Sequence, residues 1–142
     1  YECLNSIRSH VRRYGVQFVI LDYIQRVKAP QRDARYLEVG EICDDLADLA
    51  KRMQINICVL SQINRGVESR TSRRPVMSDL SESGKIEESA SRIFLLYRED
   101  AYDYDSKAKG IAEVNLAKNR FGATGVAQMA FVKELTLFAD LV

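Results

Sequence analysis

The sequence predicts an α/β fold with a parallel sheet that is completed by antiparallel strands. Short, continuous apolar runs, which are typical of strands buried on both faces, alternate with segments whose apolar residues recur at helical spacing. After residue 110 the pattern changes to strands separated by turn residues, which indicates hairpins. Strand–helix–strand alternation favours a parallel sheet, and the 142 residues suit one domain with a buried core.

The elements of the first half follow in order. A helix ends at Gly15, and the strand Phe18–Leu21 ends in Asp22. Basic, proline-containing residues 26–35 are expected to form a loop before a second, acidic-faced helix, and the strand Ile55–Leu60 ends in Ser61-Gln62. The apolar positions that define the two helices are Cys3, Leu4, Ile7, Val11 and Tyr14, and then Val39, Ile42, Cys43, Leu46, Leu49, Ala50 and Met53.

The second half begins with a polar stretch that carries four arginines. A short helical region around Ser78–Ser91 leads into a third buried strand, Arg92–Tyr97, and the acidic segment Glu99–Asp105 is expected to be a solvated loop. A turn at Asn119–Gly125 then separates the last strands. These strands are Ile111–Leu116, Val126–Val132 and Leu135–Phe138.

Composition excludes several classes of protein. Hydrophobic residues make up 46% and charged residues 29%, which fits a globular rather than a disordered chain. The apolar runs are too short to span a bilayer, and Glu2 and the nearby arginines leave no room for a signal peptide. The three cysteines and His10 lack metal-ligand spacing, so we expect buried, reduced thiols and a cytoplasmic location. Because the chain begins at Tyr1 without an initiator methionine, we expect it to be part of something longer.

Polar residues at the carboxyl ends of the strands are the first candidates for chemistry, because ligands bind there in open parallel sheets. Asp22 follows four apolar residues, which is the Walker B pattern for a carboxylate that orients Mg²⁺ and its water. An aspartate in this place also commonly caps a helix or forms a turn. Gln62 is suited to positioning a water or sensing a γ-phosphate, and it is equally suited to capping its loop. Tyr97-Arg98 ends the third strand.

Three segments resemble the DnaB-type replicative helicases and occur in that family's order. Val19–Val27 (VILDYIQRV) is similar to the family's Walker B motif. Leu60–Glu88 (LSQINRGVESRTSRRPVMSDLSESGKIEE) resembles its most distinctive segment, and Ala117–Gly125 (AKNRFGATG) resembles its hairpin motif. The resemblance covers nearly the whole chain. It implies a RecA-like three-layer α/β fold that is partial here, because the strand of the Walker A loop lies upstream, and residues 1–142 would be the C-terminal part of one RecA-like domain.

The resemblance also implies a role for each matching residue. Asp22 would hold Mg²⁺ through water, Gln62 would contact the γ-phosphate of ATP, and Lys118 and Arg120 would reach the nucleotide of a neighbouring subunit in a hexameric ring. Arg120 would be the arginine finger, a task that suits a permanently charged, bidentate guanidinium. Without the resemblance, Lys118 and Arg120 would be interpreted as a solvated hairpin tip.

The implied DNA site is the loop Ser81, Glu82, Ser83 and Gly84, whose backbone N–H groups would follow the phosphates of single-stranded DNA. Ser81 departs from the family, which usually has arginine there, and Arg26 stands where an apolar residue is usual. The arginines that precede the loop are candidates to compensate for the missing charge, with a solvated, salt-bridging surface as the alternative. They are Arg65, Arg70, Arg73 and Arg74.

The sequence lacks the phosphate-binding half of such a motor. None of its seven glycines is followed by Lys-Ser or Lys-Thr, so no Walker A loop is present. The leading hypothesis is that the chain is part of an ATP-driven, hexameric DNA helicase that moves 5′→3′. A helicase loader and primase would be further partners, and the chain would be inactive in isolation. The alternative is a truncated, non-catalytic module that binds replisome partners or intact hexamers. A RecA-family recombinase or clock-type ATPase is disfavoured by the SDLSESG and SRRP segments.

Overall fold

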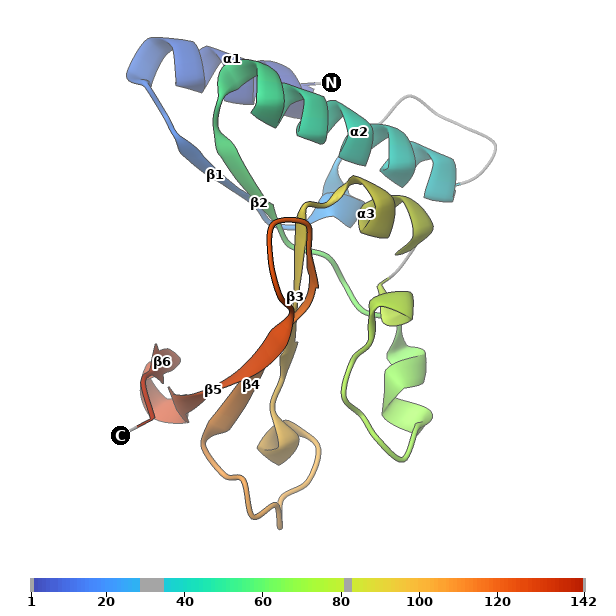
Figure 1. Ribbon diagram of the computed structural model, residues 1–142, viewed down its shortest axis with the longest axis vertical. Coiled ribbons are helices and arrows are strands. Elements are labelled where there is room, and N and C mark those ends of the chain that lie inside the picture. Colours follow the sequence, from blue (N-terminus) through green and yellow to red (C-terminus); the bar gives the residue numbers. More distant parts are fainter. Residues whose placement is uncertain (1, 29–34, 81–82, 142) are drawn as a thin grey trace. The chain divides into compact units, whose positions relative to one another are not determined.

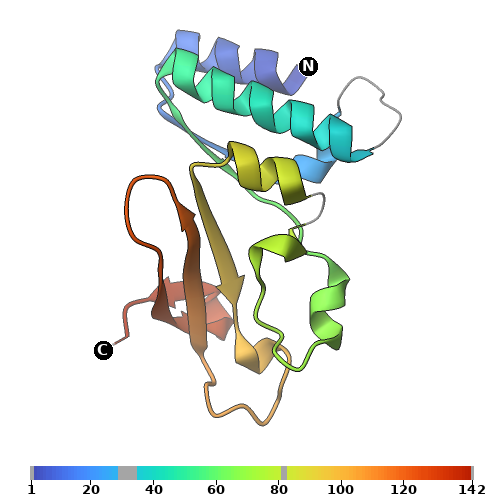
Figure 2. The ribbon, with the colours of Figure 1, turned by 45° about the vertical axis from the view of Figure 1, so that its right-hand side comes forward.

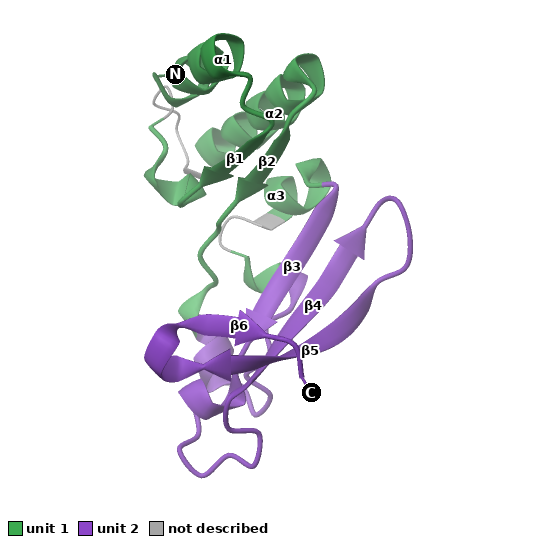
Figure 3. Ribbon diagram, turned by 90° about the vertical axis from the view of Figure 1, so that its left-hand side faces the viewer, with its two compact units in different colours: residues 1–65, 78–90 green, residues 66–77, 91–142 purple. Residues whose placement is uncertain are grey.

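The computed structural model describes residues 2–28, 35–80 and 83–141. The chain divides into two compact units, which Figure 3 shows in different colours. Unit 1 comprises residues 1–65 and 78–90, and unit 2 comprises residues 66–77 and 91–142. The expected loop at 26–35 lies largely outside the described residues; of its described residues, Arg26 ends a turn of 3₁₀ helix that begins at Ile24.

Among the described residues, unit 1 contains three α-helices and two parallel strands. Its elements are α1 (Glu2–Tyr14), β1 (Phe18–Leu21), α2 (Arg35–Met53), β2 (Asn56–Val59) and α3 (Ser83–Ser89). The predicted end of α1 is confirmed, because Gly15 adopts a φ of 65° and its N–H donates to the carbonyl of Val11 at 2.9 Å. The helices α1 and α2 lie side by side (Figure 1, Figure 2).

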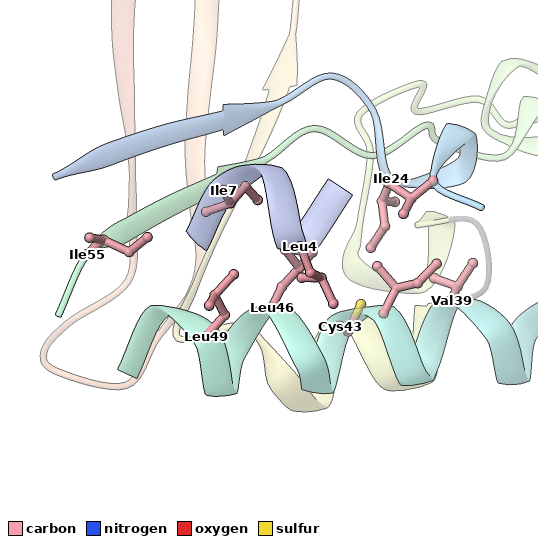
Figure 4. Close-up of a cluster of buried hydrophobic side chains, with 10 residues drawn as sticks. Leu4, Ile7, Ile24, Val39, Cys43, Leu46, Leu49 and Ile55 are labelled. Carbon is pink, nitrogen blue, oxygen red and sulfur yellow. The ribbon is translucent and has the colours of Figure 1, made fainter. Parts of the chain in front are cut away.

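The core of unit 1 lies between the helices and one face of the strand pair. β1 and β2 pair in parallel, with Phe18 opposite Asn56 and Leu21 opposite Val59. Figure 4 shows the side chains of α1 and α2 converging with Ile24 and Ile55. The predicted apolar helical positions supply most of this core, and alternate strand residues pack against it. These strand residues are Val19, Leu21, Ile57 and Val59.

The expectation that the strands are buried on both faces is wrong. Phe18 is 58% exposed and Ile20 is 64% exposed, because the helices cover only the face that carries Val19 and Leu21. Cys58 lies on the uncovered face and is exposed, so the expectation of three buried thiols holds only for Cys43. Burial, with a smaller contribution from Asp44, raises the pKa of the Cys43 thiol to about 11.

Unit 2 is a four-stranded antiparallel sheet in the order β3-β4-β5-β6. The strands are β3 (Arg92–Tyr97), β4 (Ile111–Asn119), β5 (Gly125–Val132) and β6 (Leu137–Ala139), close to the predicted spans. Within unit 2, β3 pairs with β4. It too is covered on one face only: Ile93 and Leu95 are buried, whereas Phe94 and Leu96 are exposed.

The acidic loop between β3 and β4 is exposed at residues 101–105, as expected, and its acidic side chains also make hydrogen bonds within it. Asp100 accepts a hydrogen bond from the N–H of Gly110 at 3.1 Å, which with Arg98 holds the pKa of this carboxyl below its usual value. Ser106 is buried and donates to Glu99 at 2.9 Å. The acidic side chains therefore stabilise the loop. Nowhere in the described ranges is there a helix long and apolar enough to cross a membrane.

Candidate nucleotide and DNA site

Parallel pairing of β1 and β2 brings Asp22 and Gln62 to the same end of unit 1. Asp22 follows the last residue of β1, and Gln62 lies three residues beyond β2. Backbone hydrogen bonds join the two strand ends: the N–H of Leu60 donates to Leu21 and the N–H of Ile24 donates to Leu60, both at 2.9 Å. The side chains of Asp22 and Gln62 are exposed, and the Asp22–Tyr23 peptide bond is cis. Asp22 and Gln62 therefore lie on two loops that are joined by backbone hydrogen bonds, and both side chains face solvent.

Gln25 connects these two loops through its side-chain amide. Its Nε2 donates to Oγ of Ser61 at 3.0 Å, and its Oε1 accepts the backbone N–H of Gln62 at 3.3 Å. Gln25 lies in the VILDYIQRV segment, but the sequence alone predicted no role for it. The segment also contains Asp22, Tyr23 and Arg26, so no pattern within it distinguishes Gln25.

A second connection runs from Gln62 towards the loop implied to bind DNA. Ile63 and Leu80 form an antiparallel β-bridge, and the N–H of Asn64 donates to the carbonyl of Asp79 at 2.7 Å. Of the four loop residues, Ser81 and Glu82 lie outside the described residues, and Ser83 begins α3. The residue after Gln62 is therefore paired with the residue immediately before Ser81.

Gly84 is the loop residue whose surroundings are most informative. It is exposed, and a Cβ added to it would meet no atom within 4 Å. Its φ does not lie in the left-handed range, so the chain itself does not require glycine there. An external requirement, such as a backbone or phosphate that approaches closely, would explain a glycine at this position.

The position of α3 is fixed by close packing on α2. A Cβ on Gly40 would lie 2.8 Å from Cγ of Lys85, so the absence of a side chain admits α3 to this distance. Ser89 donates to the carboxylate of Asp44 at 2.7 Å. Lys85 itself pairs with Glu88, which raises the pKa of the lysine. Gly40 is therefore a positioning residue that the sequence analysis missed.

Lys118 and Arg120 lie in unit 2, at the end of β4. Lys118 is half-buried opposite Ile93, and Arg120 is exposed with its N–H donating to Ser91 at 3.0 Å. The side chain of Asn119, which lies between them, accepts the N–H of Phe121 at 3.1 Å and donates to Ala123 at 3.0 Å. Asn119 thus shapes the turn in which Arg120 projects, a role that becomes visible only in three dimensions.

The four arginines of the polar stretch are not equivalent. Arg74 forms a bidentate pair with Glu113 on β4, with Nε and Nη2 each 2.8 Å from a carboxylate oxygen, and its guanidinium lies 4.8 Å from the Tyr97 ring centroid. This pairing lowers the pKa of Glu113 and raises that of Arg74. Arg73 donates to the carbonyl of Tyr102 at 2.9 Å. Arg65 and Arg70 are exposed.

Both contacts of Arg73 and Arg74 lie within unit 2, so these arginines attach the polar stretch to the sheet and its loop. Of the two alternatives for these arginines, DNA contact or a salt-bridging surface, Arg74 fits the second, because it is paired with Glu113. Any phosphate would have to compete with Glu113 for its guanidinium.

The arrangement fits magnesium in one respect. Mg²⁺ in nucleotide sites is commonly held by one or two carboxylates, water and the substrate's phosphates, and does not need a protein cage. Asp22 offers one exposed carboxylate at a strand end, which suits that mode of binding. Within the described ranges, no three His, Cys, Asp or Glu side chains gather to hold a metal by themselves.

Comparisons with known proteins agree with the three motifs. The sequence model of the protein family described as DnaB-like helicase C terminal domain matches residues 2–140. The replicative DNA helicase DnaC of Bacillus subtilis (strain 168) is 40% identical over 97% of this chain, and the replicative DNA helicase DnaB of Geobacillus stearothermophilus is also 40% identical over 97%. The chain spans 32% of the length of each relative, about a third.

Solved structures show the same fold. A DnaB-like replicative helicase, described together with its interactions with primase, superposes with a TM-score of 0.92 at 37% identity over 99% of this chain and 34% of its own. The ATPase domain of G40P gives the same TM-score and identity, and the chain covers 50% of it. The α/β fold is thus that of the RecA-like ATPase domain in these helicases, and the chain belongs to the DnaB-like helicase C-terminal domain family.

Proposed function

We propose that residues 1–142 are the C-terminal part of a single RecA-like ATPase domain, and that they supply part of the ATP-driven motor of a hexameric replicative helicase that unwinds duplex DNA 5′→3′. The observation that carries this proposal is that hydrogen bonds join two loops at one end of the parallel pair β1 and β2. One loop carries Asp22 and the other Gln62. This is where open α/β sheets bind ligands, and both side chains are exposed there.

In the complete domain, Asp22 would hold Mg²⁺ through bound water, and Gln62 would contact the γ-phosphate of ATP. Lys118 and Arg120 belong to the other unit, at the end of a hairpin, and would serve the nucleotide of an adjacent subunit. A guanidinium supplied in this way neutralises charge that develops during phosphoryl transfer. Asn119 supports the proposal because it holds the turn that carries Arg120.

We further propose that single-stranded DNA binds along Ser81, Glu82, Ser83 and Gly84, with the nearby arginines adding positive charge. The open space at Gly84 and the bridge between Ile63 and Leu80 support this assignment. Arg65 and Arg70 are exposed, which suits contact with phosphates, whereas the guanidinium of Arg74 is paired with Glu113. Primase and a helicase loader are proposed partners; interactions with primase are described for one of the structures that this chain resembles.

The experiment is a chimera in which residues 2–140 replace the matching segment of the Bacillus subtilis relative. Arg120→Ala should lower ATP turnover by about 10³–10⁵-fold, the range for fingers supplied in trans, while nucleotide binding is kept. Arg12→Ala, which removes an exposed arginine from α1, is the matched control.

Mixing subunits shows whether the finger acts across an interface. Arg120→Ala subunits mixed with Walker A-deficient subunits should recover turnover, since each protein keeps what the other lacks. Mixtures that never exceed either parent would contradict the assignment of Arg120. A chimera that assembles and binds partners but is inactive with every wild-type residue in place would favour the non-catalytic module instead.

A further inference from the structure

The side chain of Gln25 uses both ends of its amide on the loop that carries Gln62. The amide nitrogen donates to Oγ of Ser61 at 3.0 Å, and the amide oxygen accepts the N–H of Gln62 at 3.3 Å. Ser61 and Gln62 are 36 and 37 residues away in sequence, so these contacts exist only because β1 and β2 pair. One side chain therefore connects the segment after Asp22 with the segment that ends in Gln62.

The backbone on which Gln25 stands is firmly anchored. Its neighbour Ile24 is 1% exposed, and Val27 is buried in the same core. The turn is closed by the N–H of Arg26 donating to Tyr23 and that of Val27 donating to Ile24, both at 3.0 Å. A long side chain loses rotamer freedom when it is held at both ends of its amide. Such a side chain transmits the position of the anchored turn to the loop beyond β2.

Gln62 is also restrained on its other side. The next residue, Ile63, forms the β-bridge with Leu80, directly before Ser81. The backbone of Gln62 thus lies between two attachments, one to the turn after Asp22 and one to the segment that leads to α3. If the Gln25 contacts are removed, the strand ends stay joined through the backbone of Leu60, but Ser61 and Gln62 lose their link to the turn after Asp22.

We propose that Gln25 is a positioning residue that holds the backbone of Gln62 in register with Asp22, so that Gln62 and the segment before Ser81 respond together to the nucleotide. This inference rests on the function proposed above for Asp22 and Gln62. Gln25 itself touches neither substrate nor metal in this role. Its loss should lower turnover and its stimulation by DNA, and leave the KM for nucleotide within about twofold, because the interaction serves the reacting geometry and not ground-state binding.

The geometric half of the proposal is tested by hydrogen exchange and mass spectrometry, on peptides that contain residues 61–64. Gln25→Ala should speed exchange of one amide, that of Gln62, by about three- to tenfold, the loss expected for one net hydrogen bond. Gln25→Glu keeps an oxygen acceptor for the N–H of Gln62 and should keep the protection of that amide. Gln25→Asn is one methylene too short to reach it and should speed exchange as Gln25→Ala does. Gln17→Ala, an exposed glutamine directly before β1, is the matched control. Unchanged exchange in Gln25→Ala would overturn the tether.

The functional half uses the chimera described above. We expect Gln25→Ala to reduce DNA-stimulated kcat by about tenfold with little change in KM, and Gln25→Glu to recover most of it. If Asp22→Asn and Gln62→Ala are severe while Gln25→Ala is silent, the positioning role is wrong and the proposed function stands. If Asp22→Asn and Gln62→Ala are silent as well, the proposed function itself fails.

Discussion

Replacing Arg74 with alanine should destabilise unit 2. The guanidinium makes two hydrogen bonds of 2.8 Å to Glu113, which together form a bidentate pair. The Glu113 side chain is 19% exposed and that of Arg74 is 50% exposed, so the pair is partly screened by water. The variant would leave a mostly covered carboxylate without its cation.

The magnitude follows from these exposures. Hydrogen bonds to charged groups contribute about 1.5–3 kcal/mol when they are shielded, whereas exposed ion pairs contribute about 0.2–1 kcal/mol. A pair with one covered partner and one half-exposed partner falls between these limits. We therefore expect Arg74→Ala to lower the free energy of unfolding by about 1–2 kcal/mol, including a small loss of the contact with the Tyr97 ring.

The sign of the pH dependence is fixed by Glu113. Its pKa is lowered in the folded state, so the stabilisation is present above the ordinary glutamate pKa and disappears as the pH falls through the lowered folded-state value. Denaturant titrations of wild type and Arg74→Ala should consequently differ near neutral pH and converge in acid. Glu113→Gln removes the other partner of the pair, and its stability should likewise differ from that of wild type near neutral pH and converge with it in acid. Arg52→Ala removes an exposed i,i+4 pair with Asp48 and is the control.

The same variant separates the structural role of Arg74 from a DNA role. A phosphate contact to single-stranded DNA contributes about 0.7 to the slope of log affinity against log salt. We expect Arg74→Ala to leave that slope unchanged in the chimera. A variant of wild-type stability whose salt slope falls by about 0.7 would refute this reasoning and make Arg74 a DNA ligand.

Three further predictions concern the isolated chain and the chimera. Without a phosphate-binding loop, calorimetry at millimolar ATP–Mg²⁺ should detect negligible binding, because Asp22 alone offers only water-mediated metal contact; saturable binding would contradict this. Gly84→Leu in the chimera should weaken binding of single-stranded DNA without creating base preference. Gly84→Ala should not destabilise the chain, because its Cβ meets no atom within 4 Å. Gly40→Ala should destabilise it despite the helix propensity gained, because its Cβ would lie 2.8 Å from Cγ of Lys85. In sedimentation, the chain should self-associate with rising concentration and become monodisperse with the matching upstream segment of a relative; a monodisperse monomer unaffected by that segment would show that the exposed strand faces and edges are tolerated.

Local patterns predicted the elements because each element's signal lies within its own residues. The apolar spacing in α1 and α2 identified the core, and Gly15 marked a helix end that the left-handed φ confirms. The strands and the hairpin turn were placed within a few residues. The positions of Asp22 and Gln62 after β1 and β2 were also predictable, since a strand followed by a polar residue is a local feature. Their roles stay predictions.

Contacts between distant segments were not predictable in this way. Gln25 meets Ser61 across 36 residues, and Arg74 meets Glu113 across 39 residues. Single-residue patterns cannot rank Glu113 above the other acidic residues as the partner of Arg74. The sequence therefore did not separate Arg74 from Arg65, Arg70 and Arg73, whereas the fold distinguishes it through its bidentate pair with Glu113 on β4.

The error about strand burial has a physical cause that bears on function. An apolar run such as Phe18–Leu21 is expected where a strand is covered on both faces in the complete fold. In the described residues α1 and α2 cover one face of this strand. Within the described residues, β2 and β3 each have a hydrogen-bonded neighbour on one edge. Because the chain covers 50% of the G40P ATPase domain at a TM-score of 0.92, we propose that segments equivalent to the remainder of that domain cover the exposed faces and edges. The apolar residues Ile20 and Leu96 would then be core residues of a larger domain, and the same covering segments would bring the phosphate-binding loop to the end of β1 and β2 where Asp22 and Gln62 lie.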